Sequence, residues 1–169
     1  MRPSAALALA LTAAACAPAA EPPRADRRQT IVDLTLNQSE RGRPGWTLRS
    51  RLAQLREEQN NATLESPIMD FYTDGKISSR VTAINGEIAT DTHDVHLSSA
   101  VVLTSYEDHS VLTTDRMVYS SKAKRFRTDS DVVVRRPEGV AYGRGMEATP
   151  DLSEIHIYQQ HSILSGKSQ

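Results

Sequence analysis

Cysteine and large aromatic residues are scarce in this sequence. Among its 169 residues there are one Cys, one Trp and two Phe. A single Cys cannot form a disulfide within the chain, and it offers no set of cysteine ligands for a metal ion. The composition, which is 38% hydrophobic and 24% charged, favours a thin sandwich or a partly open sheet with much polar surface over a thick globular core.

An excess of charge of either sign is also missing. The 20 Lys and Arg residues nearly balance the 21 Asp and Glu residues, which leaves a formal net charge of −1. A chain without a basic patch or an acidic tail is not expected to bind nucleic acid. Its length corresponds to one domain of ordinary size.

The sequence lacks motifs of catalysis and metal binding as well. His93 and His96 lie three residues apart, a spacing that puts them on opposite faces of a strand, and His109 lies in a predicted turn. His156 and His161 flank the last predicted strand. We expect all five histidines to be solvated side chains. There is no Gly-x-Ser-x-Gly motif, so we expect no enzyme, no metal site and no cofactor.

One segment, residues 143–148 (GRGMEA), formally matches the dinucleotide-binding fingerprint. That fingerprint needs a helix directly after the glycines. Pro150 follows almost at once and argues against such a helix. We therefore expect Gly143 and Gly145 to lie at a bend in a strand, or where two backbones approach closely.

The first residues resemble a bacterial export signal. Arg2 is followed by a run of eleven small and mostly apolar residues, Ala5 to Ala15, and then by Cys16. Such a run is too short for a bilayer core, which needs about 20 residues. It predicts a secretory signal peptide over residues 1–15.

The position of the only cysteine indicates a lipid anchor. The segment that ends in Cys16 resembles a lipobox, the lipidation site of bacterial lipoproteins, although the usual Leu three positions earlier is Ala13. Ordinary cleavage nearby, which would leave Cys16 removed or free, is the alternative. We expect a lipidated or flexible tether over residues 16–30, a β-domain over residues 31–165 and a short tail over residues 166–169.

From residue 31 onward the apolar residues recur with a period of two. In residues 95–104 four apolar side chains alternate with mostly polar ones, and residues 132–134 and 155–158 show the same pattern. Side chains two apart share one face of a sheet, so these runs predict half-buried strands. Turn sequences separate the strands at residues 74–75, 85–86, 107–108 and 137–139.

Asn85-Gly86 is the strongest hairpin signal in the chain. It lies between residues 81–84 and 87–90, and a type I′ turn needs two central residues that tolerate a positive φ. Short strands separated by frequent turns predict an all-β domain, an antiparallel meander that is closed or nearly closed.

Residues 46–59 are ambiguous. Leu48, Leu52 and Leu55 fit a helical stripe, whereas the alternation that starts at Trp46 indicates a strand. We favour a strand, because the neighbouring segments are predicted strands and no good helix N-cap is present.

A Thr-Asp pair recurs at residues 90–91, 114–115 and 128–129, each time ahead of an apolar alternation. The unequal intervals exclude a strict solenoid. The recurrence suggests one hairpin-like unit that is stacked repeatedly in an elongated body.

Six short segments between residues 46 and 162 carry a family resemblance. They are Trp46-Thr47-Leu48, Asp70-Phe71-Tyr72-Thr73-Asp74-Gly75, Val81-Thr82-Ala83 with Gly86, Asp94-Val95-His96-Leu97 with Val101, Leu112-Thr113-Thr114-Asp115-Arg116-Met117-Val118-Tyr119 and Gly143-Arg144-Gly145-Met146. In this order and at this spacing they resemble the LptC family, the periplasmic component of the lipopolysaccharide-export ABC transporter.

The resemblance implies a single open antiparallel β-jellyroll, elongated and with free sheet edges. It implies that acyl chains of lipopolysaccharide pass through the apolar interior, from the inner-membrane ABC transporter subunits toward the soluble jellyroll protein of the periplasmic bridge. It places the domain in the periplasm, anchored to the inner membrane. The chain departs from the family at its start, because members commonly carry one transmembrane helix where this sequence has a signal run and Cys16.

We expect one face of successive strands to line the lipid groove. An ordinary closed core would show the same pattern, and an envelope lipoprotein that scaffolds other jellyroll proteins without carrying lipid is the alternative function. The expected groove residues are Trp46, Leu48, Phe71, Val81, Val95, Leu97, Val101, Leu103, Met117, Val132 and Val134.

The last predicted strand is the expected docking edge for the next jellyroll protein. It carries Ile155 and Ile157 on one face and His156 and Tyr158 on the other, without the Lys or Pro that usually blunts an exposed edge. Pairing of this strand inside the domain is the alternative.

Overall fold

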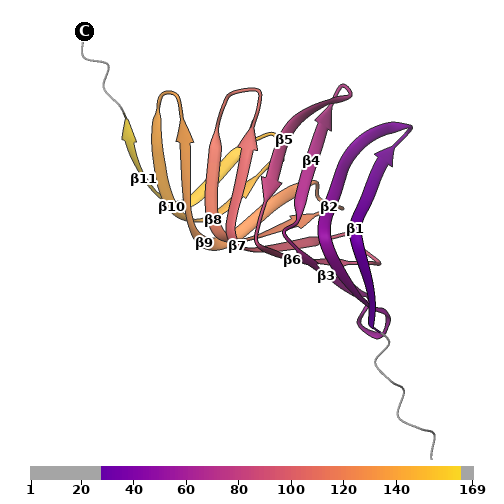
Figure 1. Cartoon of the computed structure of the whole chain (residues 1–169). Helices are drawn as coiled ribbons and strands as arrows, with labels where there is room; N and C mark the ends of the chain where they lie inside the picture. The colour runs from indigo at the N-terminus through magenta and orange to yellow at the C-terminus, as the bar shows by residue number, and fades with distance from the viewer. Residues whose placement is uncertain (1–27, 165–169) are drawn as a thin grey trace, which may run out of the picture.

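The computed structural model describes residues 28–164, and β-strands make up most of this part of the chain. Eleven strands form one antiparallel sheet, and a short 3-10 helix, η1 (Glu57–Gln59), follows the second strand. In Figure 1 the strands fan out from β1 at one end to β11 at the other. They are β1 (Arg28–Glu40), β2 (Arg43–Arg56), β3 (Asn61–Glu65), β4 (Ile68–Thr73), β5 (Lys76–Thr82), β6 (Asn85–Ala89), β7 (Val95–Ser105), β8 (Val111–Ser120), β9 (Arg125–Arg136), β10 (Gly139–Ala148) and β11 (Ile155–Leu164).

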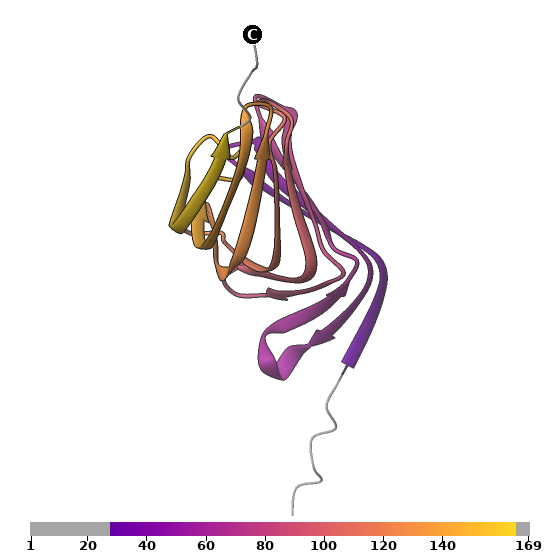
Figure 2. The same ribbon diagram turned by 90° about the vertical axis from the view of Figure 1, so that its left-hand side faces the viewer.

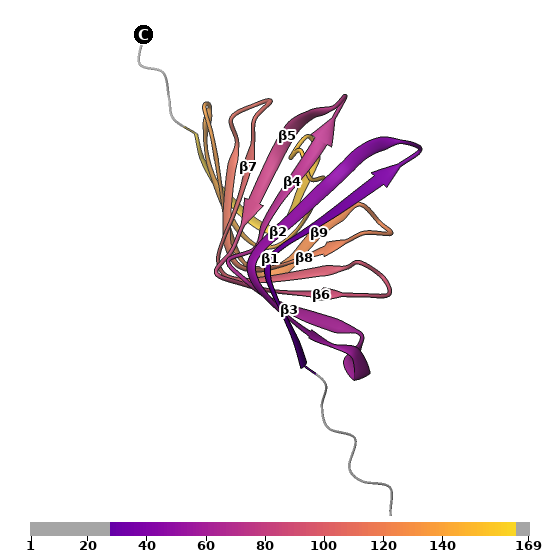
Figure 3. The same cartoon turned by 45° about the vertical axis from the view of Figure 1, so that its right-hand side comes forward.

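The sheet bends along a line that crosses its long strands, which we call the crease. β2 pairs with β4 through residues 46–49 and with β3 through residues 52–56. β7 pairs in the same way with β6 through residues 95–98 and with β5 through residues 102–105. The long strands therefore run through two half-sheets: half A, which contains β4 and β5, and half B, which contains β3 and β6. Figure 3 shows the halves diverging from the crease, and Figure 2 shows strands that curve from one half into the other.

Irregular backbone accompanies the bend. In β7, Ser99 and Ala100 have φ values of 66° and 54°, and the pairing with β8 shifts register beside them. In β10, Gly145 has a φ of 74°, and the pairing with β9 shifts register at the same place. Such β-bulges bend a strand without ending it. The expectation of a glycine at a strand bend is therefore confirmed for Gly145.

Hydroxyl side chains bond to backbone groups at the crease. Thr114 Oγ1 donates to Asp131 O at 2.8 Å, and Ser130 N–H donates to Thr128 Oγ1 at 3.1 Å. Two of the three Thr-Asp pairs thus lie where β8 and β9 bend, and residues 90–91 lie in the turn after β6. The idea that these pairs mark a repeated hairpin unit is wrong, because two of them fall in the middle of long strands.

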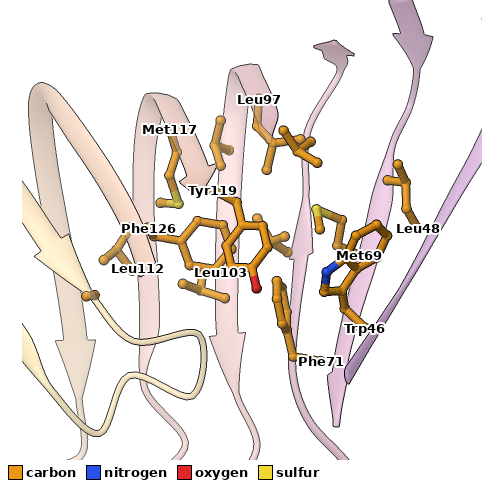
Figure 4. Close-up of a cluster of buried hydrophobic side chains, with 14 of the residues drawn as sticks. Trp46, Leu48, Met69, Phe71, Leu97, Leu103, Leu112, Met117, Tyr119 and Phe126 are labelled. Carbon is orange, nitrogen blue, oxygen red and sulfur yellow. The ribbon is translucent and has the colours of Figure 1, made fainter. Parts of the chain in front are cut away.

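The apolar faces of the two halves pack against each other inside the bend. Phe71 of half A contacts Tyr119 and Phe126 of half B, with ring centroids 5.0 and 5.4 Å away. The Tyr119 and Phe126 rings are 5.2 Å apart, and Figure 4 shows the three rings within the buried cluster. Aromatic pairs at these distances stabilise a core beyond the area that they bury.

The predicted fold class is confirmed: the domain is an all-β, open antiparallel jellyroll. The expectation of a closed or nearly closed sheet is wrong, because within the described residues β1 and β11 each pair with only one neighbour. The strand predicted over residues 46–59 is confirmed as far as Arg56, where η1 takes over. β1 begins at Arg28, ahead of the domain start predicted at residue 31.

The hairpin predicted at Asn85-Gly86 is wrong. These two residues begin β6, which pairs with β3 and β7 and not with β5. Gly86 packs closely there, because a Cβ atom would lie 3.0 Å from Pro67 Cγ and 3.3 Å from His96 O. The turn predicted at Asp74-Gly75 does join β4 to β5, and both residues have positive φ values, 51° and 77°.

A buried carboxylate joins three strands of half A. Asp70 on β4 accepts hydrogen bonds from Arg49 Nη2 on β2 at 2.6 Å and from Arg80 Nε on β5 at 2.6 Å. The Asp70 side chain is only 3% exposed, whereas those of the two arginines are 47% and 38% exposed. Such charge-assisted bonds fix the relative register of the strands.

Asp70→Asn should lower the free energy of unfolding by about 1–2 kcal/mol, because two guanidinium groups lose their charged acceptor while partial exposure limits the cost. Urea denaturation monitored by circular dichroism measures the change. Asp129→Asn, at an exposed position of β9, is the matched control and should shift the midpoint little. Equal shifts in both variants would contradict this role of Asp70.

Candidate functional site

The eleven residues predicted to line a groove all lie on the inner surface of the bent sheet. Each is at most 4% exposed, and all belong to one apolar cluster. Val95, Leu97 and Met117 come from half B, and the other eight come from half A. The period-two pattern therefore identified one continuous interior that both halves share.

Several interior residues escaped prediction. Tyr119 and Phe126 flank a polar turn, and Met69 and Met146 stand in short or irregular alternations, so the period-two pattern gave only weak signals there. Leu152 gave none, because it lies in the polar loop between β10 and β11. It is nevertheless fully buried, with a φ of 61°, and its carbonyl oxygen accepts a hydrogen bond from Arg136 Nη2 at 3.4 Å.

An apolar cavity of about 500 Å³ opens into the interior at the β1 end of the sheet. Leu34 and Leu36 of β1 are only partly buried there, and Ile31 is 37% exposed. We call this space the apolar cavity. Its lining includes Ile31, Leu34, Leu36, Trp46, Ala53, Leu55, Ala62 and Ile88.

A second, more polar cavity of about 790 Å³ lies between three chain connections, and we call it the polar mouth. The three connections are the turn after β1, the turn after β8 and the loop after β10. Trp46, Phe71 and Tyr119 contribute aromatic side chains to it. Trp46 and Gln38 line both the polar mouth and the apolar cavity, so the two spaces adjoin.

Two contacts join the end of β1 to the turn after β8 across the polar mouth. Glu40 and Lys124 form an ion pair, and Ser121 Oγ donates to Gln38 Oε1 at 3.2 Å. The Lys124 ammonium lowers the pKa of the Glu40 carboxyl below its ordinary value, so the pair stays charged at neutral pH.

Tyr119 supplies a hydroxyl group beside the polar mouth. Burial, with the nearby carboxylates Asp94 and Glu40, raises the pKa of Tyr119 to about 12. The hydroxyl therefore remains protonated and able to donate at any physiological pH.

The predicted docking strand is β11, and one side of it pairs with β10. Ile155 and Ile157 pack against the core, while His156 and Tyr158 are exposed, with their rings 5.3 Å apart. Pairing inside the domain is thus observed on one side of β11. Its other side has no strand partner within residues 28–164.

Gly143 allows β11 to lie close to β10. A Cβ atom at this position would come within 2.2 Å of Ile157 Cγ2 and 2.6 Å of Gln159 O. The expectation of a close backbone approach is confirmed here, and the resemblance of residues 143–148 to a dinucleotide fingerprint has a structural explanation.

The described residues show no cluster of three or more His, Cys, Asp or Glu side chains that could hold a metal ion. Between residues 28 and 164 no helix has the length and apolar character that spanning a membrane requires. The predicted lipidation site, Cys16, lies outside the described residues, as do the signal segment and most of the tether.

Comparison with known proteins yields one family. The family described as "Lipopolysaccharide-assembly, LptC-related" matches residues 5–163, which is nearly the whole chain. No curated protein sequence matches the chain.

Proposed function

Because the chain belongs to the LptC family, a family of periplasmic lipopolysaccharide-transport proteins, we propose that it receives lipopolysaccharide from the inner-membrane ABC transporter. It would pass the lipid along its apolar interior to the next jellyroll protein of the bridge. The observation that carries this proposal is the apolar interior shared by both half-sheets, which adjoins a cavity of about 500 Å³ at the β1 end. Cavities of this size and apolar character suit a small part of a lipid, such as one acyl chain.

Acyl chains would enter where the interior is least covered. β1 is an edge strand, and its inward-facing Leu34 and Leu36 are only partly buried. Deeper in, the eleven residues first predicted as groove residues would contact the acyl chains as the lipid moves along the sheet. The packing of Phe71 against Tyr119 and Phe126 is the side-chain contact that the lipid would have to displace.

Photo-crosslinking tests lipid transport directly. Benzoylphenylalanine in place of Leu36, which lines the apolar cavity, should yield a lipopolysaccharide adduct in living cells. The matched control is Thr35, the neighbouring exposed residue on the opposite face of β1, and it should yield little adduct. Equal labelling at both positions, or none at Leu36, would contradict passage through the interior.

The second candidate function is a scaffold that joins jellyroll proteins without carrying lipid. One observation favours it: the predicted groove residues are at most 4% exposed and fill the space between the halves as a core does. On this alternative, crosslinks from Leu36 would capture proteins only and no lipopolysaccharide.

We infer that β11 docks the next jellyroll protein, since its outer side offers unpaired backbone groups for β-augmentation. β1 would then face the transporter. Benzoylphenylalanine at the exposed Tyr158 of β11 should crosslink to the soluble bridge protein. The same probe at Tyr142, which is also exposed but lies on β10, should crosslink far less. Comparable crosslinking from Tyr142 would place the docking surface on the sheet face.

We also propose that Cys16 carries the lipid anchor that holds the domain at the inner membrane. Two or more acyl chains give stable attachment where one chain is marginal. Labelled palmitate should enter the wild-type protein and be absent from Cys16→Ala, and the variant should move from the membrane fraction to the soluble fraction. Equal labelling of both proteins, or of neither, would contradict lipidation at this residue.

A further inference from the structure

We propose that the polar mouth binds the phosphate of a glycolipid headgroup while an acyl chain of the same molecule occupies the apolar cavity. This inference rests on the proposed function, and it adds which chemical group the protein recognises and where. Three independent features of the polar mouth support it.

The first feature is a buried donor without an acceptor. Trp46 is 4% exposed, and its indole Nε1–H has no hydrogen-bond partner among the described residues. Figure 4 shows the indole nitrogen on the side of the ring that faces Phe71, another residue that lines the polar mouth. Buried donors in native proteins are nearly always paired. An unpaired donor beside a cavity is therefore available to a ligand that brings an acceptor.

The second feature is a pair of exposed cations. Arg41 and Arg43, in and after the turn that follows β1, line the polar mouth and are exposed. Neither guanidinium forms a hydrogen bond or an ion pair with any residue that the structure describes, and the Arg41 charge only adds to the effect of Lys124 in lowering the pKa of Glu40. Guanidinium groups bind phosphate through two parallel hydrogen bonds and stay charged at all physiological pH values.

The carboxylates at the polar mouth, by contrast, already have partners. Glu40 is paired with Lys124. Asp151 accepts hydrogen bonds from Ser153 N–H at 3.1 Å and from Ser153 Oγ at 2.8 Å. Hydrogen bonds from Thr149 and Ser153 keep the pKa of Asp151 low despite its partial burial. The charge left free at the polar mouth is therefore positive.

The third feature is the position of Trp46 between the two spaces. Its side chain lines both the polar mouth and the apolar cavity. A ligand with an anionic head and an apolar tail could thus occupy both spaces and contact Trp46 from each. This arrangement suits an amphiphile better than a free anion, which would leave the apolar cavity without a ligand.

Trp46 is the only tryptophan in the chain, so its fluorescence reports on the place where the polar mouth and the apolar cavity adjoin. The full chain is titrated with lipid A that carries its phosphates, and with the same lipid A after their removal, both dispersed in one non-ionic detergent. The phosphorylated lipid should shift the emission saturably and bind roughly fivefold or more tightly than the dephosphorylated lipid. Inorganic phosphate alone should bind far more weakly than either.

Arg41→Gln/Arg43→Gln should abolish most of the preference for phosphate and leave binding of the dephosphorylated lipid unchanged. Arg135→Gln/Arg144→Gln removes the same charge at two other exposed positions and serves as the control. Trp46→Phe, followed by calorimetry, removes the indole donor while keeping an aromatic ring, and it should weaken binding of the phosphorylated lipid more than binding of the dephosphorylated lipid.

The outcomes separate this inference from the proposed function. Equal affinity for the two lipids, or equal losses in the variant and its control, would overturn the phosphate site while lipid carriage stands. If inorganic phosphate bound as tightly as the lipid, the claim that the ligand is an amphiphile would be wrong. If neither lipid binds, the site and the proposed function both fail.

Discussion

The bend in the long strands is the constraint on which the rest of the structure depends. Because β2 and β7 keep their backbone pairing on both sides of the crease, one sheet forms both walls of the interior. No second sheet or helix is needed to cover the apolar face. Bulges with positive φ at Ser99, Ala100 and Gly145 make this possible, and hydroxyl groups of β8 and β9 bond to the backbone where regular pairing is interrupted.

A bent sheet of this kind has two consequences that belong together. It buries a core of apolar side chains between its halves, which stabilises the domain, and it leaves unpaired edges at β1 and β11. Other folds cover their edges or close into barrels. Here the edges lie at the two ends of the interior (Figure 1), so a neighbouring jellyroll that pairs with an edge would also extend the apolar surface.

Much of the fold was predictable because apolar and polar side chains alternate along the strands on either side of the crease. Val101 and Leu103 show the alternation plainly, and the eleven chosen residues share one cluster. The crease itself was not predictable, since bulges depend on pairing between strands distant in sequence. Asn85-Gly86 was misassigned for the same reason: the two residues begin a strand that pairs with β3 and β7, and Gly86 packs tightly against Pro67 and His96. Leu152 and the unpaired donor of Trp46 become visible only in three dimensions.

The contacts across the polar mouth bear on how the domain folds and opens. Glu40 and Lys124 are 84 residues apart in the chain, and Gln38 and Ser121 are 83 apart. Closing so long a loop costs chain entropy that only the intervening strand pairs can offset, so these contacts form late. Both lie at exposed or half-exposed side chains, where ion pairs and hydrogen bonds contribute little free energy. The two contacts can therefore break in a local fluctuation of low free energy while the strands stay paired, and salt should make the loss of the ion pair more frequent.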